Sequence, residues 1–136
     1  MIGVIVITHG QFGQYLLEAA QIILGPQEQH AHIAIEGSTD VAELIAQLKT
    51  TVQRLDSGNG VVILTDMFGG TPSNISLSLL QTDKVDVLTG VNLPMLLRIF
   101  GMRATSLPQL VEEAKKAAIQ GIVAAGEVLS RKIPKG

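Results

Sequence analysis

Short apolar runs alternate with amphipathic segments along this chain. Residues 2–7 and 61–64 are continuous runs rich in Val and Ile, which is typical of strands buried on both faces of a sheet. The segment at 31–36 alternates from one residue to the next, so we expect a strand that is less buried. A fourth strand is predicted at 85–90. Between these strands, apolar residues recur at helical spacing.

The helical spacing predicts where helices begin and end. The predicted helices are 11–24, a second one from Asp40 to about residue 55, a third from Pro72 through Leu80, a short one at 95–100 and a longer one from about 107. Asp40 with Glu43 has capping-box spacing, and Thr71 suits an N-cap before Pro72. The tail at 128–136 fits a helix, an edge strand or a disordered segment.

Strands that alternate with helices indicate βαβ units. We therefore predict an α/β fold with one doubly wound, mainly parallel sheet of about four strands and helices on both faces. Residues 1–136 show no internal repeat or linker, so a single domain is expected. In such a sheet, ligands bind beyond the carboxyl ends of the strands, where the order of strand addition reverses.

Composition excludes several classes of function. The net charge is −2 and only 3% of residues are aromatic, which does not favour binding to nucleic acid or to an anionic membrane. The chain has no cysteine, so disulfides and thiol chemistry are excluded. No stretch reaches the length needed to span a bilayer, and no signal peptide is visible. We expect a cytoplasmic protein.

Candidate chemistry gathers at the ends of two predicted strands. His9 follows the first strand and Asp66 follows the third. If these strands are neighbours, Asp66 can accept the Nδ1 proton of His9, which leaves Nε2 as a nucleophile or base. The loop Gly69-Gly70-Thr71 then supplies close backbone approach, a hydroxyl and a helix N-terminus for an anion. Together these features suggest phosphoryl transfer through phosphohistidine.

Simpler interpretations compete with each of these residues. Asp66 can be only a loop cap, Thr71 only an N-cap, and Gly69-Gly70 only a turn. His30 and His32 are interpreted as solvent-facing residues of a peripheral strand, since they lack partners at metal-site spacing. No nucleotide-binding motif and no nucleophile elbow is present, and no metal or other cofactor is expected. A triad of Ser73 or Ser76 with His9 and Asp66 is a weak alternative.

Three motifs in order resemble one known family. Thr8-His9-Gly10, the segment 66–74 (DMFGGTPSN) and the segment 90–96 (GVNLPML) are similar to the IIA domain of the mannose-family sugar phosphotransferase system. The resemblance covers nearly the whole chain. It implies a flavodoxin-like fold and a homodimer, in which a C-terminal strand, here placed after Gly121, is exchanged between subunits as an antiparallel edge strand.

The resemblance also implies roles for individual residues. His9 would accept a phosphoryl group from phosphorylated HPr and pass it to a IIB component, with Asp66 orienting the imidazole. Thr71, commonly serine in the family, would help to hold the phosphoryl group. Phe68 stands where tryptophan is frequent and would keep its part in partner docking.

The same resemblance sets expectations for partners and leaves alternatives. Because no IIB domain follows Gly136, IIB is expected to be a separate chain, and the membrane is reached only indirectly through IIC and IID components. One alternative is a regulatory module that senses the phosphorylation state of His9 without sugar transport. Another is the phosphoryl-transfer subunit of a dihydroxyacetone kinase, a family that generally lacks the Gly-Gly-Thr/Ser-Pro loop. The sugar is not encoded in this sequence.

Overall fold

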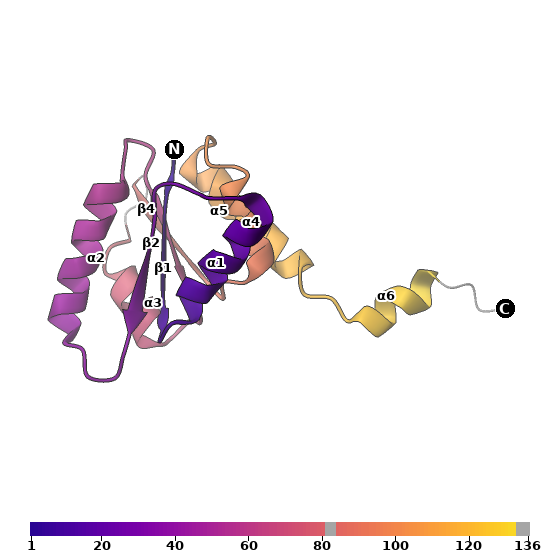
Figure 1. Ribbon diagram of the computed structural model, residues 1–136, viewed down its shortest axis with the longest axis horizontal. Helices are drawn as coiled ribbons and strands as arrows, with labels where there is room; N and C mark the ends of the chain where they lie inside the picture. Colours follow the sequence, from indigo (N-terminus) through magenta and orange to yellow (C-terminus); the bar gives the residue numbers. More distant parts are fainter. Residues whose placement is uncertain (81–83, 133–136) are drawn as a thin grey trace.

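A four-stranded parallel sheet lies at the centre of the protein (Figure 1). The structure is a computed structural model, and it describes residues 1–80 and 84–132. The strands are β1 (Gly3–His9), β2 (His30–Ile35), β3 (Val61–Thr65) and β4 (Val85–Thr89). Their order is β2-β1-β3-β4, so the direction of strand addition reverses between β1 and β3. This order confirms the predicted doubly wound sheet and makes the ends of β1 and β3 neighbours.

Helices cover both faces of the sheet, as predicted (Figure 1). The described helices are α1 (Phe12–Leu24), α2 (Val41–Leu55), α3 (Thr71–Leu77), α4 (Leu93–Phe100), α5 (Leu107–Gln120) and α6 (Ala125–Lys132). Side chains of α1, α4 and α5 share one apolar core with alternate residues of β1 and β3. Those of α2 and α3 share a second core with the other residues of the same strands. The alternation arises because successive side chains of a strand point to opposite faces.

The predicted strands differ in burial as expected. Six of the seven residues of β1 and all five of β3 are buried. In β2 most residues are only half-buried, because β2 is an edge strand with a neighbour on one side. Asp40 caps α2 by accepting a hydrogen bond from the Ala42 N–H at 3.1 Å.

The start and end of α3 differ from the prediction. Gly70 occupies the N-cap, and Thr71 is already the first helical residue, with an exposed side chain that makes no capping bond. The helix ends at Leu77 and does not continue through Leu80. From Ser78 onward the backbone N–H groups bond to carbonyls three residues earlier, so the chain tightens out of the α-helix.

The predicted edge strand after Gly121 was wrong for the residues that the structure describes. Gly121 ends α5, and residues 125–132 form α6 instead of a strand. Figure 1 shows α6 extending away from the sheet. The α6 sequence also contains Ala, Glu, Leu, Arg and Lys, which are good helix formers. Residues 133–136 of the tail lie outside the described residues.

At the amino end of the sheet, a buried arginine joins three chain segments. The Arg103 side chain is 6% exposed and donates from Nε to the Ile2 carbonyl at 2.9 Å. Its Nη2 donates to the Gln29 carbonyl at 2.7 Å, and its Nη1 donates to the Glu28 carbonyl. The guanidinium also lies over the Phe100 ring, 5.5 Å from the ring centre. These contacts fix the beginnings of β1 and β2 against the end of α4.

Candidate active site at the carboxyl end of the sheet

His9 and Asp66 meet at the switch point, as the sequence predicts. The Nδ1 atom of His9 lies 2.7 Å from Asp66 Oδ2. The backbone N–H of His9 donates to the same carboxylate oxygen at 3.0 Å. The other oxygen of Asp66 accepts a bond from the Met67 N–H at 2.9 Å. The carboxylate therefore joins the end of β1 to the loop that follows β3.

This geometry defines which ring nitrogen of His9 is available. An ionised carboxylate only accepts hydrogen bonds, so Nδ1 of His9 must carry the proton toward Asp66. The neutral imidazole then has its lone pair on Nε2. The His9 side chain is 53% exposed, whereas that of Asp66 is 15% exposed. The partly buried carboxylate of Asp66 thus orients the imidazole of His9, which an incoming protein can reach.

The environment of Asp66 keeps its carboxylate ionised. Partial burial alone would raise the pKa of Asp66. The hydrogen bonds from the backbone and ring of His9, the charge of His9 and the bond from the Met67 N–H together outweigh burial and hold that pKa below its ordinary value of 3.8. Asp66 is therefore an acceptor for His9 throughout the neutral range.

The glycine loop after β3 passes close to the imidazole. A Cβ atom added to Gly70 would lie 2.9 Å from Cε1 of His9 and 3.4 Å from Nε2. A side chain at this position would therefore displace the ring. Gly69 has a φ of +94°, a left-handed conformation that favours glycine. Both predicted glycines thus have a structural reason to be at their positions, and Thr71 follows with its side chain exposed.

Sequence reasoning assigned no role to the residue before His9. Thr8 is fully buried, and its hydroxyl accepts a hydrogen bond from the Gly13 N–H at 2.9 Å. The available signal was a polar residue at an inward-facing position of an otherwise apolar strand. That signal does not reveal which backbone group the hydroxyl meets.

Comparison with known proteins supplies the family. The sequence model described as "PTS system fructose IIA component" matches residues 3–118, which covers all four strands and most of α5. The chain belongs to this family.

Curated relatives and solved structures agree with that assignment. The "PTS system mannose-specific EIIAB component" of Escherichia coli strain K12 is 31% identical over 90% of this IIA chain. The chain spans 39% of the length of that relative. The "PTS system fructose-specific EIIA component" of Bacillus subtilis is 29% identical, over 96% of this chain and 91% of its own. A crystal structure of phosphotransferase system component EIIA from Streptococcus agalactiae superposes with a TM-score of 0.83 at 31% identity, covering 93% of this chain and 99% of that one.

Family membership is as far as the comparisons reach. The matching family model and these curated relatives carry the names of IIA or IIAB components of the phosphotransferase system. The family model, the Bacillus subtilis relative and the Streptococcus agalactiae structure carry the names of phosphotransferase system components, and they do not favour the dihydroxyacetone kinase alternative.

The other candidate residues of this IIA component lie outside the His9 site. His30 and His32 are half-buried on β2, so their description as solvent-facing was wrong. The cause is packing: His30 meets Phe100 edge-on at 6.0 Å between ring centres, and His32 lies beside Gly13.

Ser76 donates its hydroxyl to the Pro72 carbonyl, and the buried Ser73 hydroxyl makes no bond to His9. The serine triad is therefore not formed.

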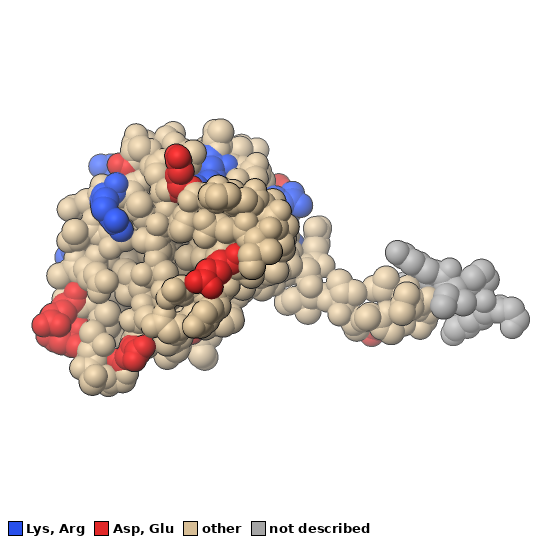
Figure 2. Space-filling view, viewed as in Figure 1, with Lys and Arg blue, Asp and Glu red and all other residues tan. Residues whose placement is uncertain are grey.

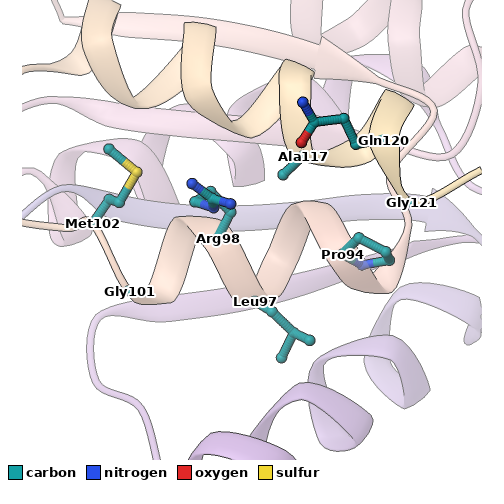
Figure 3. Close-up of a pocket in the computed structure, with 8 residues that line it drawn as sticks. All are labelled: Pro94, Leu97, Arg98, Gly101, Met102, Ala117, Gln120 and Gly121. Carbon is teal, nitrogen blue, oxygen red and sulfur yellow. The ribbon is translucent and has the colours of Figure 1, made fainter.

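Exposed apolar side chains lie on the loops and the helix next to His9. The Phe68 side chain is 72% exposed, and Met67 and Phe12 beside the two loops are about half exposed. A groove of about 560 Å³ lies elsewhere, between α4 and α5 (Figure 3). It is lined by Pro94, Leu97, Arg98, Gly101, Met102, Ala117, Gln120 and Gly121. None of these residues belongs to the His9 site.

The part of the chain that the structure describes contains neither a cluster of metal ligands nor a membrane-spanning helix. Within 1–80 and 84–132, no three His, Asp or Glu side chains come together in a way that could hold a metal ion. In the same part of the chain, no helix combines the length and the apolar character needed to cross a membrane.

Proposed function

We propose that His9 is the residue of this IIA component that becomes phosphorylated and that Nε2 carries the phosphoryl group. The observation that supports the proposal most strongly is the 2.7 Å contact between His9 Nδ1 and Asp66 on a ring that is 53% exposed. In the first transfer, the P–N bond on the donor histidine breaks as the lone pair of His9 Nε2 forms a new one. The departing donor imidazole keeps the electron pair of its broken bond. The second transfer repeats this exchange toward a histidine of IIB.

The protein's contribution to this exchange is positioning and electrostatic stabilisation. One P–N bond replaces another, so the chemical step needs an aligned ring and support for the charge on the transferring group. Asp66 supplies the alignment through its two bonds to His9. Gly70 lies close to Nε2, and Gly69 allows the loop its left-handed turn. We propose that the exposed Thr71 donates its hydroxyl to a phosphoryl oxygen.

Phosphorylation adds negative charge beside an ionised carboxylate. A phosphoryl group carries close to two negative charges at neutral pH, and it would arrive beside a carboxylate whose pKa is held below its ordinary value in the unphosphorylated protein. The backbone N–H groups in the first turn of α3 lack partners within their helix and carry partial positive charge. We propose that they, with Thr71, offset the repulsion and keep the phosphorylated state accessible.

Two protein partners would use the same exposed face. We propose HPr as donor and IIB on a separate chain as acceptor, both docking over Phe68, Met67 and Phe12 around His9. Lys and Arg side chains do not gather into a patch on the face shown in Figure 2, and the net charge is −2. This distribution gives no support to binding of nucleic acid or of a membrane surface, so contact with the membrane would be indirect, through IIC and IID.

The assembly of the chain is a separate part of the proposal. Ile119, Ile122, Val123 and Leu129 are all more than half exposed near the end of α5 and on the segment after it. Exposed apolar side chains that follow one another along the chain are typical of an interface. We propose that residues 1–136 act as one domain and that this apolar end mediates a homodimer.

Incubation with phosphorylated HPr followed by intact-mass measurement tests the proposed function. We expect the protein to gain the mass of one phosphoryl group, and we expect acid treatment to remove it. His9→Ala should abolish the gain. The chain contains three histidines, so His30→Ala and His32→Ala are matched controls that should retain it. A gain that persists in His9→Ala, or no gain with several HPr homologues, would overturn the proposal.

A further inference from the structure

The first turn of α1 is capped by a residue of the preceding strand. Gln11 occupies the N-cap of α1, but its side chain makes no capping bond. Instead the Gly13 N–H donates to Thr8 Oγ1 at 2.9 Å, in a fully buried contact. Such a bond satisfies one of the backbone donors that a helix N-terminus leaves unpaired. The Thr8 hydroxyl at the end of β1 therefore caps α1 in place of the Gln11 side chain.

The bond closes a short turn that contains His9. Gly10, the next residue, has a left-handed φ of +56°, and its N–H donates to the Ile35 carbonyl at 2.9 Å. The Thr8 hydroxyl also lies 3.5 Å from the Gly10 carbonyl oxygen. His9 is thus held between a strand residue and a helix residue that are bonded to each other.

Packing at Gly13 makes this connection rigid. A Cβ atom added there would lie 3.0 Å from Thr8 Cγ2 and 2.7 Å from Val6 Cγ1. The first turn of α1 therefore rests directly on β1, with no space between the backbone and the Thr8 methyl group. The methyl and hydroxyl groups of Thr8 act on the same helical turn, one by packing and one by hydrogen bonding.

Asp66 alone leaves one motion of His9 unrestrained. Both bonds from His9 end on the same atom, Asp66 Oδ2, so these two bonds by themselves do not fix the angle of the residue about that oxygen. The turn closed by Thr8 fixes the direction in which the chain leaves His9, and this restrains the pivot. The restraint matters because the catalytic lone pair must point at the incoming phosphorus, and small misplacements of a reacting atom cost large factors in rate.

We propose that Thr8 is a positioning residue for phosphoryl transfer. Its hydroxyl holds the His9–Phe12 turn so that Nε2 faces solvent beside Gly70. The proposal rests on the function proposed above, since it assumes that His9 is the phosphorylated residue. It adds that the rate of transfer depends on a buried hydroxyl that never touches the phosphoryl group.

Four variants test this role. Thr8→Val keeps the shape of the side chain and removes the hydroxyl, Thr8→Ala removes both parts, and Thr8→Ser retains the hydroxyl. Thr51→Val is the matched control, because Thr51 is also buried and its hydroxyl donates to the Gln47 carbonyl at 2.7 Å, but it lies on α2. For each variant, rapid-quench transfer from phosphorylated HPr gives the rate constant at saturation and the KM, and thermal unfolding gives the Tm.

The expected pattern separates positioning from stability. In Thr8→Val and Thr8→Ala, the saturating rate constant should fall about tenfold with KM unchanged, and Thr8→Ser should transfer within about twofold of the natural chain. Thr51→Val should lower the Tm without changing the rate constant. If either Thr8→Val or Thr8→Ala is folded in the assay and transfers with the same rate constant as the natural chain, Thr8 is not a positioning residue. Absence of phosphorylation in the natural chain would instead overturn the function of His9, so the two failures are distinguishable.

Discussion

The two ends of the sheet hold their central side chains in opposite ways. At the amino end, Arg103 is 6% exposed and donates to three backbone carbonyls from two other segments of the chain. At the carboxyl end, the His9 side chain is 53% exposed and its ring has one partner, Asp66. At the amino end, the donors of Arg103 form hydrogen bonds that hold the fold together. At the carboxyl end, Nε2 of His9 is left available. We therefore expect substitutions at the two ends to affect different measurements.

The amino end should give the largest change in stability. Arg103→Met removes all three donors from a buried position, and we expect the free energy of unfolding to fall by about 3 kcal/mol, because hydrogen bonds from charged groups and unsatisfied carbonyls both contribute. Chemical denaturation measures this change. Arg54→Met, at an exposed position of α2, is the control and should stay within about 0.5 kcal/mol. If folded Arg103→Met transfers the phosphoryl group more slowly than the natural chain, the two ends of the sheet do not differ in the way described here.

The carboxyl end should show the reverse behaviour. Asp66→Asn presents an amide to His9 Nδ1, which favours the tautomer with its proton on Nε2 and removes the nucleophile. We expect transfer from phosphorylated HPr to slow on the order of 10²-fold with little change in Tm. Asp40→Asn is the control, because Asn caps a helix as well as Asp does. Full transfer by Asp66→Asn would remove Asp66 from the mechanism.

A smaller effect should follow from filling the space beside the imidazole. Gly70→Ala places a Cβ atom 2.9 Å from His9 Cε1, so the ring must move. We expect transfer to slow about tenfold. Gly37→Ala is the control, because a Cβ atom there meets nothing within 4 Å. Equal rates in both variants would show that the ring is not confined by the loop.

The smallest effect concerns pH at the amino end. Burial, with a further contribution from the charge of Arg103, holds the pKa of His30 below its ordinary value of 6.5, although a hydrogen bond with the backbone of Gln27 acts in the opposite direction. The unfolded chain therefore binds a proton more readily, and stability falls as the pH drops below 6.5 toward the folded-state pKa. His30→Leu should reduce this fall in Tm, by about 2 °C for a half-buried ring. An unchanged dependence of Tm on pH would contradict the role of His30.

The sequence predicted the carboxyl end better than the amino end. Apolar runs followed by His9 and Asp66 place both residues at one edge, because parallel strands end together. The contacts of Arg103 could not be predicted, since they depend on backbone carbonyls that lie more than seventy residues away along the chain. Thr8 was missed for the same reason: a buried hydroxyl is visible in sequence, but its partner is not.

Errors at the other boundaries also have local physical causes. Residues 125–132 favour a helix when no sheet edge is beside them, so an exchanged edge strand does not follow from their sequence. Thr71 has the chemistry of an N-cap, but Gly70 adopts the extended conformation at that position and Thr71 enters the helix. Local propensity therefore predicted that an element begins here, but the N-cap lies one residue earlier than the chemistry of Thr71 suggests.

The central claim is that Asp66 reserves Nε2 of His9 for the phosphoryl group. Heteronuclear NMR of the ¹⁵N-histidine-labelled protein, after phosphorylation by HPr, tests it directly through the coupling between phosphorus and a ring nitrogen. We predict that the coupled nitrogen is Nε2 of His9 and that Nδ1 retains its proton toward Asp66. A phosphoryl group on Nδ1, or on any residue other than His9, would contradict the account.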